Sequence, residues 1–193
     1  SLPQWQNQTK HDLHSKKMGG PPLLPFTIQS RKSELISNSH FNHGIKGWRT
    51  WPSEIIHIQW DSTQSNLSVR NEGDKYGLVI SSPFPMKAGK TYQIKAKLFS
   101  KEPSMVKFVP RFNASPYTAQ TVLHSTVDST GTEFNRIFEA KHSYDNCRLD
   151  IDIKPGSDIS VENVSIAEVT ATKTSWRDKY LIKQNPSDTK VTQ

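Results

Sequence analysis

Strict alternation of apolar and polar side chains in two segments constrains the fold of this chain most strongly. In Thr91–Ser100, the apolar residues Ile94, Ala96 and Leu98 alternate with mostly polar neighbours, and Cys147–Lys154 reads CRLDIDIK. Successive side chains of an extended strand point to opposite faces. Both segments therefore predict strands with one buried face and one wet face, as in an antiparallel sandwich.

The central region contains more short runs of this kind, separated by Gly, Pro, Asn and Asp at spacings typical of all-β domains. Further strands are expected at Ser33–Ile36, Ile55–Trp60, Asn66–Arg70, Tyr76–Ser81, Met105–Asn113, Ala119–His124, Glu133–Lys141 and Ile159–Val169. No long helical pattern interrupts them. We predict an all-β fold, a two-sheet antiparallel β-sandwich.

The two ends of the chain have a different texture. Residues 1–33 contain GGPPLLP and many polar residues without sustained periodicity, which indicates a linker or extension. Only 33% of the 193 residues are hydrophobic, so part of the chain must lie outside any core. We predict a sandwich over residues 34–170 and a tail over residues 171–193. Within this tail, Trp176, Tyr180 and Lys183 can share one side of a short helix.

The charge of the chain indicates which partners it favours, and its cysteine content limits the disulfides it can form. The chain has 25 Lys and Arg against 18 Asp and Glu, a formal charge of +7, which favours anionic partners such as acidic polysaccharide or nucleic acid. The single cysteine, Cys147, cannot close an internal disulfide, and we interpret it as a small buried side chain.

No apolar run approaches the roughly 18 residues needed to cross a bilayer, so no membrane span is expected. The chain as given also lacks a signal-peptide pattern.

The segment LISNSHFNHGIKGWRTW, residues 35–51, resembles the opening of the family 4/9-type carbohydrate-binding modules. The matching residues are Asn38, Phe41, Gly44, Gly47 and Trp48. Independently of the resemblance, Trp48 offers a large apolar area that can close one end of a small sandwich, so we assign it to the core.

Three later segments resemble the same family in the same order. They are MKAGKTYQIKAKLFS (residues 86–100), TGTEFNRIFEA (130–140) and ISVENVSIAEV (159–169). The resemblance implies a galactose-binding-domain-like jelly roll that holds sugar chains without cutting them. It also implies a protein that works outside the cytoplasm, in an extracellular, periplasmic or cell-surface location.

Many members of the resembled family hold a structural calcium ion through an early Glu and a late Asp. The matching residues here are Asn42 and Asn163, which removes two charges from a site whose cation prefers carboxylate oxygens. Glu162 or Asp61 can still contribute a carboxylate. The sequence therefore allows a structural calcium ion without favouring it, and no other cofactor is expected.

The resemblance places the sugar on the concave face of one sheet, where exposed aromatic rings and polar groups can hold it. The candidate residues are Tyr76, Lys95, Lys97, Arg111, Tyr117, Asp150 and Asp152. We expect them to form one charged groove, with the lysines opposing the aspartates if their two strands share a sheet. Trp51 and Trp60 are further candidates whose facing the sequence leaves open. The basic residues favour an anionic glycan as the ligand.

Other functions stay as alternatives. No hydrolase, metalloprotease, nucleotide-binding or lyase motif is present, so we predict a protein that is not an enzyme. A polysaccharide lyase can nevertheless use Arg, His and Tyr, here Arg111, His124 and Tyr117. A nucleic-acid binder fits the charge, but the basic residues are not interleaved with aromatics. A protein-interaction module of a polysaccharide-handling system that has lost sugar binding is the remaining alternative.

Overall fold

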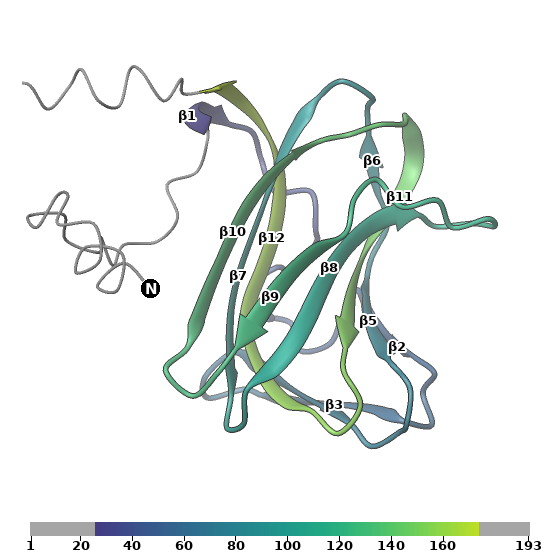
Figure 1. The fold of residues 1–193 in the computed structure, drawn as a ribbon, viewed down its shortest axis with the longest axis vertical. Helices are drawn as coiled ribbons and strands as arrows, with labels where there is room; N and C mark the ends of the chain where they lie inside the picture. Colours follow the sequence, from purple (N-terminus) through teal and green to yellow (C-terminus); the bar gives the residue numbers. More distant parts are fainter. Residues whose placement is uncertain (1–25, 174–193) are drawn as a thin grey trace, which may run out of the picture.

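The computed structural model describes residues 26–173, which form two antiparallel sheets packed face to face (Figure 1). This part of the chain contains twelve strands and no helix. The predicted all-β, two-sheet antiparallel sandwich is therefore confirmed.

The first sheet, called the β7 sheet, has the strand order β10-β7-β12-β4-β3, and β1 also pairs with β12. Its strands are β1 (Phe26–Arg31), β3 (Ile56–Asp61), β4 (Asn66–Asn71), β7 (Thr91–Ser100), β10 (Thr132–Glu139) and β12 (Asp158–Lys173). The long strand β12 occupies the middle: its first part pairs with β4 and β7, and its end pairs with β1.

The second sheet, called the β11 sheet, has the order β2-β5-β11-β8-β9, and β6 also pairs with β11. Its strands are β2 (Trp48–Trp51), β5 (Gly77–Ser81), β6 (Phe84–Met86), β8 (Ser104–Phe112), β9 (Leu123–Val127) and β11 (Tyr144–Ile153). In Figure 1, β10 and β7 lie on the left of the view, and β5 and β2 lie on the right.

The core lies between the two sheets and follows the alternation in the sequence. Ile94 and Leu98 of β7 and Leu149 of β11 are fully buried in one hydrophobic cluster. Phe108 of β8 stacks on Phe134 of β10 with 4.2 Å between ring centres, which joins the sheets across the core. The expected alternation of inward and outward side chains on β7 and β11 is thus confirmed. The outer face of β11 is not wet as expected, because Arg148 is only 8% exposed and Asp150 is fully buried.

The opening loop before β2 is held by one amide side chain. Asn38 donates hydrogen bonds to the backbone carbonyls of Gly44 (2.8 Å) and Lys46 (3.0 Å), and its Oδ1 accepts the backbone N–H of His43 (3.0 Å). Trp48 is 6% exposed and packs on Phe41, with 5.4 Å between ring centres. The assignment of Trp48 to the core is therefore confirmed.

Several strand predictions are wrong in position. Ser33–Ile36 is not a strand, although the backbone N–H of Leu35 donates to the Ile166 carbonyl at 2.9 Å. The Glu34 carboxylate also accepts the backbone N–H groups of Leu35, Ile36 and Ile166. The strand expected at Ala119–His124 lies instead at β9, Leu123–Val127. The short strands β2 and β6 were not predicted, because three or four residues are too few to show a period.

The sandwich also reaches beyond the expected boundaries. Strand β1 lies within the range 1–33 that was expected to be a linker or extension, and it pairs with the end of β12 from Phe26 opposite Lys173. Its six residues, FTIQSR, alternate too briefly to stand out from the polar sequence around them. The rest of the expected N-terminal extension, and the short helix expected around Trp176 and Tyr180, lie outside the described residues.

Candidate functional site

The outer face of the β11 sheet carries its side chains in rows that the strand register fixes. One row runs across the five strands through His124, Lys107, Asp152, Leu78 and Trp51. The next row contains Val109, Asp150, Ile80 and Arg49, and a third places Arg111 beside Arg148. Antiparallel pairing therefore brings aromatic, apolar and charged groups from distant parts of the chain onto one surface.

A hollow of about 360 Å³ opens on this face. Its lining residues are Arg49, Trp51, Leu78, Ile80, Arg111, Tyr117 and Arg148. Trp51 is 59% exposed and Tyr117 is 48% exposed, so both rings present apolar area to solvent at the hollow. Exposed rings beside convergent polar groups are the ordinary make-up of a ligand site.

Asp150 organises the basic side of the hollow. Its carboxylate is fully buried and accepts two hydrogen bonds from Arg148, Nε to Oδ1 at 2.8 Å and Nη2 to Oδ2 at 3.1 Å. Arg111 Nε lies 2.9 Å from the same Oδ2, as an ionic contact. Asn113 Oδ1 accepts a third bond from Arg148, at 3.1 Å. The two guanidinium groups are therefore held in place before any ligand arrives.

Asp152, two residues further along β11, is in a different situation. Its Oδ1 is buried without a hydrogen-bond partner among residues 26–173. Burial raises the pKa of this carboxyl above its ordinary value of 3.8; Arg111 lowers it and Asp150 raises it further. Lys107 and His124 have smaller lowering effects. The site thus contains one carboxylate engaged by two arginines and one that is not engaged.

Two cations rest on the aromatic rings of this face. Lys107 Nζ lies 4.0 Å from the centre of the Tyr76 ring, and the Arg148 guanidinium lies 5.1 Å from that of Tyr117. Cation–π contacts of this kind hold an exposed ring in one orientation. Tyr76 and Tyr117 are therefore positioned at the two ends of the charged surface.

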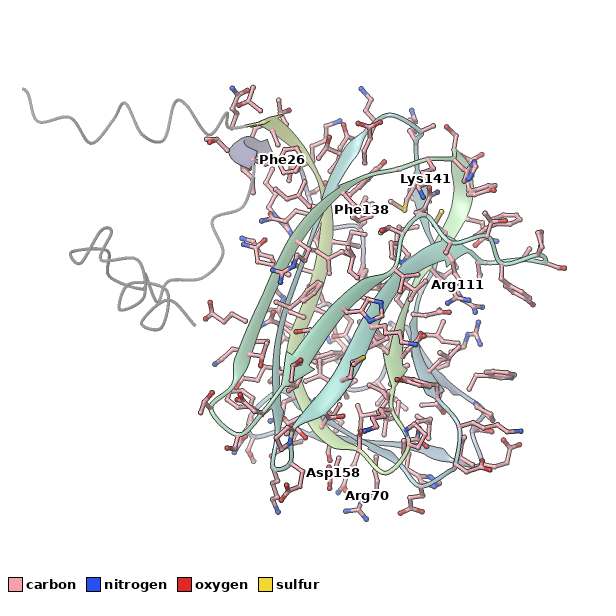
Figure 2. The ribbon with its side chains drawn as sticks, in the orientation of Figure 1. Phe26, Arg70, Arg111, Phe138, Lys141 and Asp158 are labelled. Carbon is pink, nitrogen blue, oxygen red and sulfur yellow. The ribbon has the colours of Figure 1, made fainter. Side chains whose placement is uncertain are left out.

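The structure brings five of the seven predicted carbohydrate-binding residues together on the β11 sheet. These are Tyr76, Arg111, Tyr117, Asp150 and Asp152. Figure 2 shows Arg111 towards the right of the view, on the side of the molecule away from β10 and β7. Of these five residues, Arg111 and Tyr117 line the hollow, and the role of all five in binding stays a prediction.

Lys95 and Lys97 do not join them. Both lie on β7, in the opposite sheet, where Lys97 Nζ contacts Glu162 at 2.7 Å. The single groove expected from lysines and aspartates on neighbouring strands is therefore wrong, because β7 pairs with β10 and β12 and not with β11. Alternation predicts which side chains share a face of one strand, but not which strands share a sheet.

Sequence reasoning missed Arg49 and Arg148 and left the facing of Trp51 open. A usable signal was present in GWRTW: once Trp48 is assigned to the core, period-2 alternation sends Arg49 and Trp51 to the outer face. Arg148 alternates with the buried Leu149 in the same way. The exposed face of a strand is thus predictable from one confidently buried neighbour.

The two residues predicted as possible calcium ligands lie in the opening loop and on β12. Asn42 is exposed in the opening loop, and Asn163 is half-buried on β12 opposite Lys97. Within residues 26–173, no group of three or more His, Cys, Asp or Glu side chains is placed to hold a metal ion. Calcium favours several oxygens including carboxylates, and these two neutral amides do not meet that requirement.

Two further predictions, on the cysteine and on membrane spans, can be compared with the described residues. Cys147 is fully buried, as expected, and burial raises the pKa of its thiol. Across the part of the chain that the structure describes, no helix has the length and apolar character to pass through a bilayer.

Comparison with known proteins places the fold in one class. No family model and no curated protein sequence matches the chain. Among solved structures, it resembles the second N-terminal cellulose-binding domain of Cellulomonas fimi β-1,4-glucanase C, with a TM-score of 0.58 and 10% identity over 75% of this chain and 99% of that one. A CBM4 structure gives 0.57 and 12% identity, covering 69% and 99% of the two chains.

The CBM22-1 xylan-binding domain from Paenibacillus barcinonensis Xyn10C gives a TM-score of 0.55 and 9% identity, covering 74% of this chain and 97% of that one. These likenesses show that the chain has the fold of carbohydrate-binding modules. At such low identity they do not distinguish family 4/9 from the related families, so the predicted family resemblance is supported at the level of the fold.

Proposed function

We propose that this protein binds a polysaccharide without cleaving it, on the outer face of the β11 sheet. The observation that carries the proposal is the hollow beside the exposed rings of Trp51 and Tyr117, on a fold shared with carbohydrate-binding modules. Sugar rings have apolar C–H faces edged by hydroxyl groups, so they can stack on such rings while guanidinium groups bind their polar edges.

The charge of the hollow favours an acidic polysaccharide. Arg49, Arg111 and Arg148 all line it, while the one buried carboxylate beneath them, Asp150, neutralises only part of their charge. Guanidinium groups pair with carboxylate or sulfate through two parallel hydrogen bonds. A glycan that carries such groups is therefore the ligand class we propose.

The arrangement supports binding more than catalysis. Asp150 is fully buried and held by two arginines, so it cannot reach a bound sugar as an acid or a base. A protein that binds polysaccharide works where polysaccharide occurs, and we therefore propose an extracellular, periplasmic or cell-surface location.

A glycan array probed at low and at high salt tests the proposal. We expect retention of uronate-containing or sulfated glycans, weakening as salt rises because the guanidinium–anion contacts are partly screened. Binding only to neutral glucans, without salt dependence, would contradict the acidic ligand. Retention of a protein partner with no glycan would instead favour an interaction module, and new unsaturated sugar ends after incubation would indicate a lyase.

A further inference from the structure

Asp152 is a carboxylate without a partner beside a set of arginines. Its side chain forms no hydrogen bond or ion pair with another described residue, and its Oδ1 is buried. Lys107 lies directly opposite it across the β8–β11 pairing, yet its ammonium group is placed over the Tyr76 ring. A desolvated carboxylate with an unused acceptor site is costly for a fold unless something else binds it.

Asp152 lies just outside the lining of the hollow, opposite the lining residue Leu78, so the hollow and its margin present two chemically different ends. The arginine end consists of Arg49, Arg111 and Arg148. The aspartate end consists of Asp152, with Leu78 next to it in the same row and Trp51 on the far side of Leu78. Positions two residues apart on β11 are separated by about 6.6 Å along the strand. One such step, close to the length of one sugar ring in a chain, separates the row of Asp152 from the row of Arg49, and two steps separate it from the row of Arg111 and Arg148.

We propose, resting on the carbohydrate binding proposed above, that the site selects acidic glycans in which the sugar next to the charged one is uncharged. The arginine end holds the acidic group of one sugar. The next sugar stacks on Trp51 and donates a hydroxyl or amide hydrogen bond to Asp152. A second carboxylate on that sugar would lie against the carboxylate of Asp152.

Two physical effects of the same sign produce this selection. A hydrogen bond to a charged acceptor strengthens binding of the uncharged neighbour. Repulsion between two carboxylates in a partly desolvated site weakens binding of a charged neighbour. Asp152 is therefore a specificity-determining residue, and its charge, rather than its size, is what discriminates.

Hyaluronan and polygalacturonate oligosaccharides of equal length test the inference. Hyaluronan carries a carboxylate on alternate sugars, whereas polygalacturonate carries one on every sugar. By calorimetry near neutral pH and at low salt, we expect the unmodified protein to bind hyaluronan at least about tenfold more tightly. Asp152→Asn is expected to bind polygalacturonate several-fold more tightly and so to reduce this ratio, because it removes the repelling charge.

Glu133→Gln is the matched control, since it removes one exposed carboxylate from β10 in the opposite sheet and should leave the ratio unchanged. Equal affinity of the unmodified protein for both glycans would overturn the inference while acidic-glycan binding stands. So would an Asp152→Asn protein, folded by circular dichroism, with an unchanged ratio. If the unmodified protein binds neither of these nor any other acidic glycan, the proposed function fails and this inference fails with it.

Discussion

Arg148 and Asp150 point to the same side of β11, and the Arg148 guanidinium donates two parallel hydrogen bonds, 2.8 and 3.1 Å long, to the Asp150 carboxylate. They stand two residues apart, so the extended strand itself sets their spacing. The pair is almost wholly buried, with the Arg148 side chain 10% exposed and that of Asp150 not exposed. A surface proposed to bind sugar is thus built around a buried ion pair.

Removing one partner of this pair is expected to destabilise the fold. Asp150→Ala leaves Arg148 buried without its counter-ion, and Arg111 loses its contact at the same time. We expect a loss of about 3 kcal/mol in the free energy of unfolding. Urea denaturation followed by tryptophan fluorescence measures it.

Asp145→Asn, an exposed change at the start of the same strand, serves as the control and should alter stability by less than about 0.5 kcal/mol. A similar small effect for Asp150→Ala would show that the buried pair contributes nothing to the fold.

The facing of side chains was predictable from the sequence, and the pairing of strands was not. Alternation around Ile94 and Leu149 placed both in the core, because period 2 is a local property of an extended chain. The partners of β7 and β11 are far away in sequence and depend on the packing of the whole sandwich. This is why Lys97 was grouped with Asp152 although the two lie on opposite sheets.

Only part of the candidate site was predicted from the sequence, because alternation is local whereas the site combines several strands. Arg111 was chosen as a basic residue on the polar face of a strand and Tyr117 as an aromatic residue in a loop, and the structure does place them at the hollow. Arg49 was overlooked because β2 has only four residues, so its alternation is informative only when it is counted from the buried Trp48. A hollow also depends on side chains from several strands, which no local pattern contains.

Trp51 is expected to provide the main apolar contact with a bound sugar. Its side chain is 59% exposed at the hollow, so Trp51→Ala removes a stacking surface without opening the core. We expect the affinity for a retained glycan to fall at least about tenfold, which corresponds to ~1.4 kcal/mol. Affinity electrophoresis in gels containing that glycan measures the change.

Trp60→Ala is the matched control, because Trp60 is 38% exposed on β3 of the opposite sheet. It should leave retention in the gel unchanged. Equal losses for the two variants would place the sugar elsewhere or show a general effect of removing tryptophan.

Calcium is not expected to stabilise the fold through Asn42 and Asn163. Both are neutral, and in the described part of the chain no cluster of acidic side chains accompanies them. Adding calcium, or removing it with a chelator, should shift Tm by less than about 1 °C. Differential scanning calorimetry of the full chain provides the measurement. A concentration-dependent rise of several degrees would show that backbone and amide oxygens form a site after all.

The buried carboxyl of Asp152 should make stability depend on pH in a particular direction. Burial raises its pKa in the folded protein, so the folded state holds the proton more tightly than the unfolded chain does. The resulting stability is present at pH values below the unfolded pKa and is lost as pH rises through the folded pKa. Arg111, Asp150, Lys107 and His124 face the carboxyl and modulate this effect.

Asp152→Asn removes the part of the pH dependence of stability that comes from this carboxyl, so a comparison with the unmodified protein shows the direction of that part. The variant should be more stable than the unmodified protein near pH 7 by ~1 kcal/mol, because an unpaired desolvated charge is gone. The difference should shrink as pH falls through the raised pKa of Asp152 in the folded protein and disappear below the ordinary pKa of an aspartate, where the carboxyl is protonated in both states. Asp61 and Asp128 have lowered pKa values, chiefly from hydrogen bonds with Thr63 and Thr130, and they act in both proteins and so cancel. Urea unfolding across this range measures the difference, and a difference that grows on acidification would mean that Asp152 is stabilised as an anion.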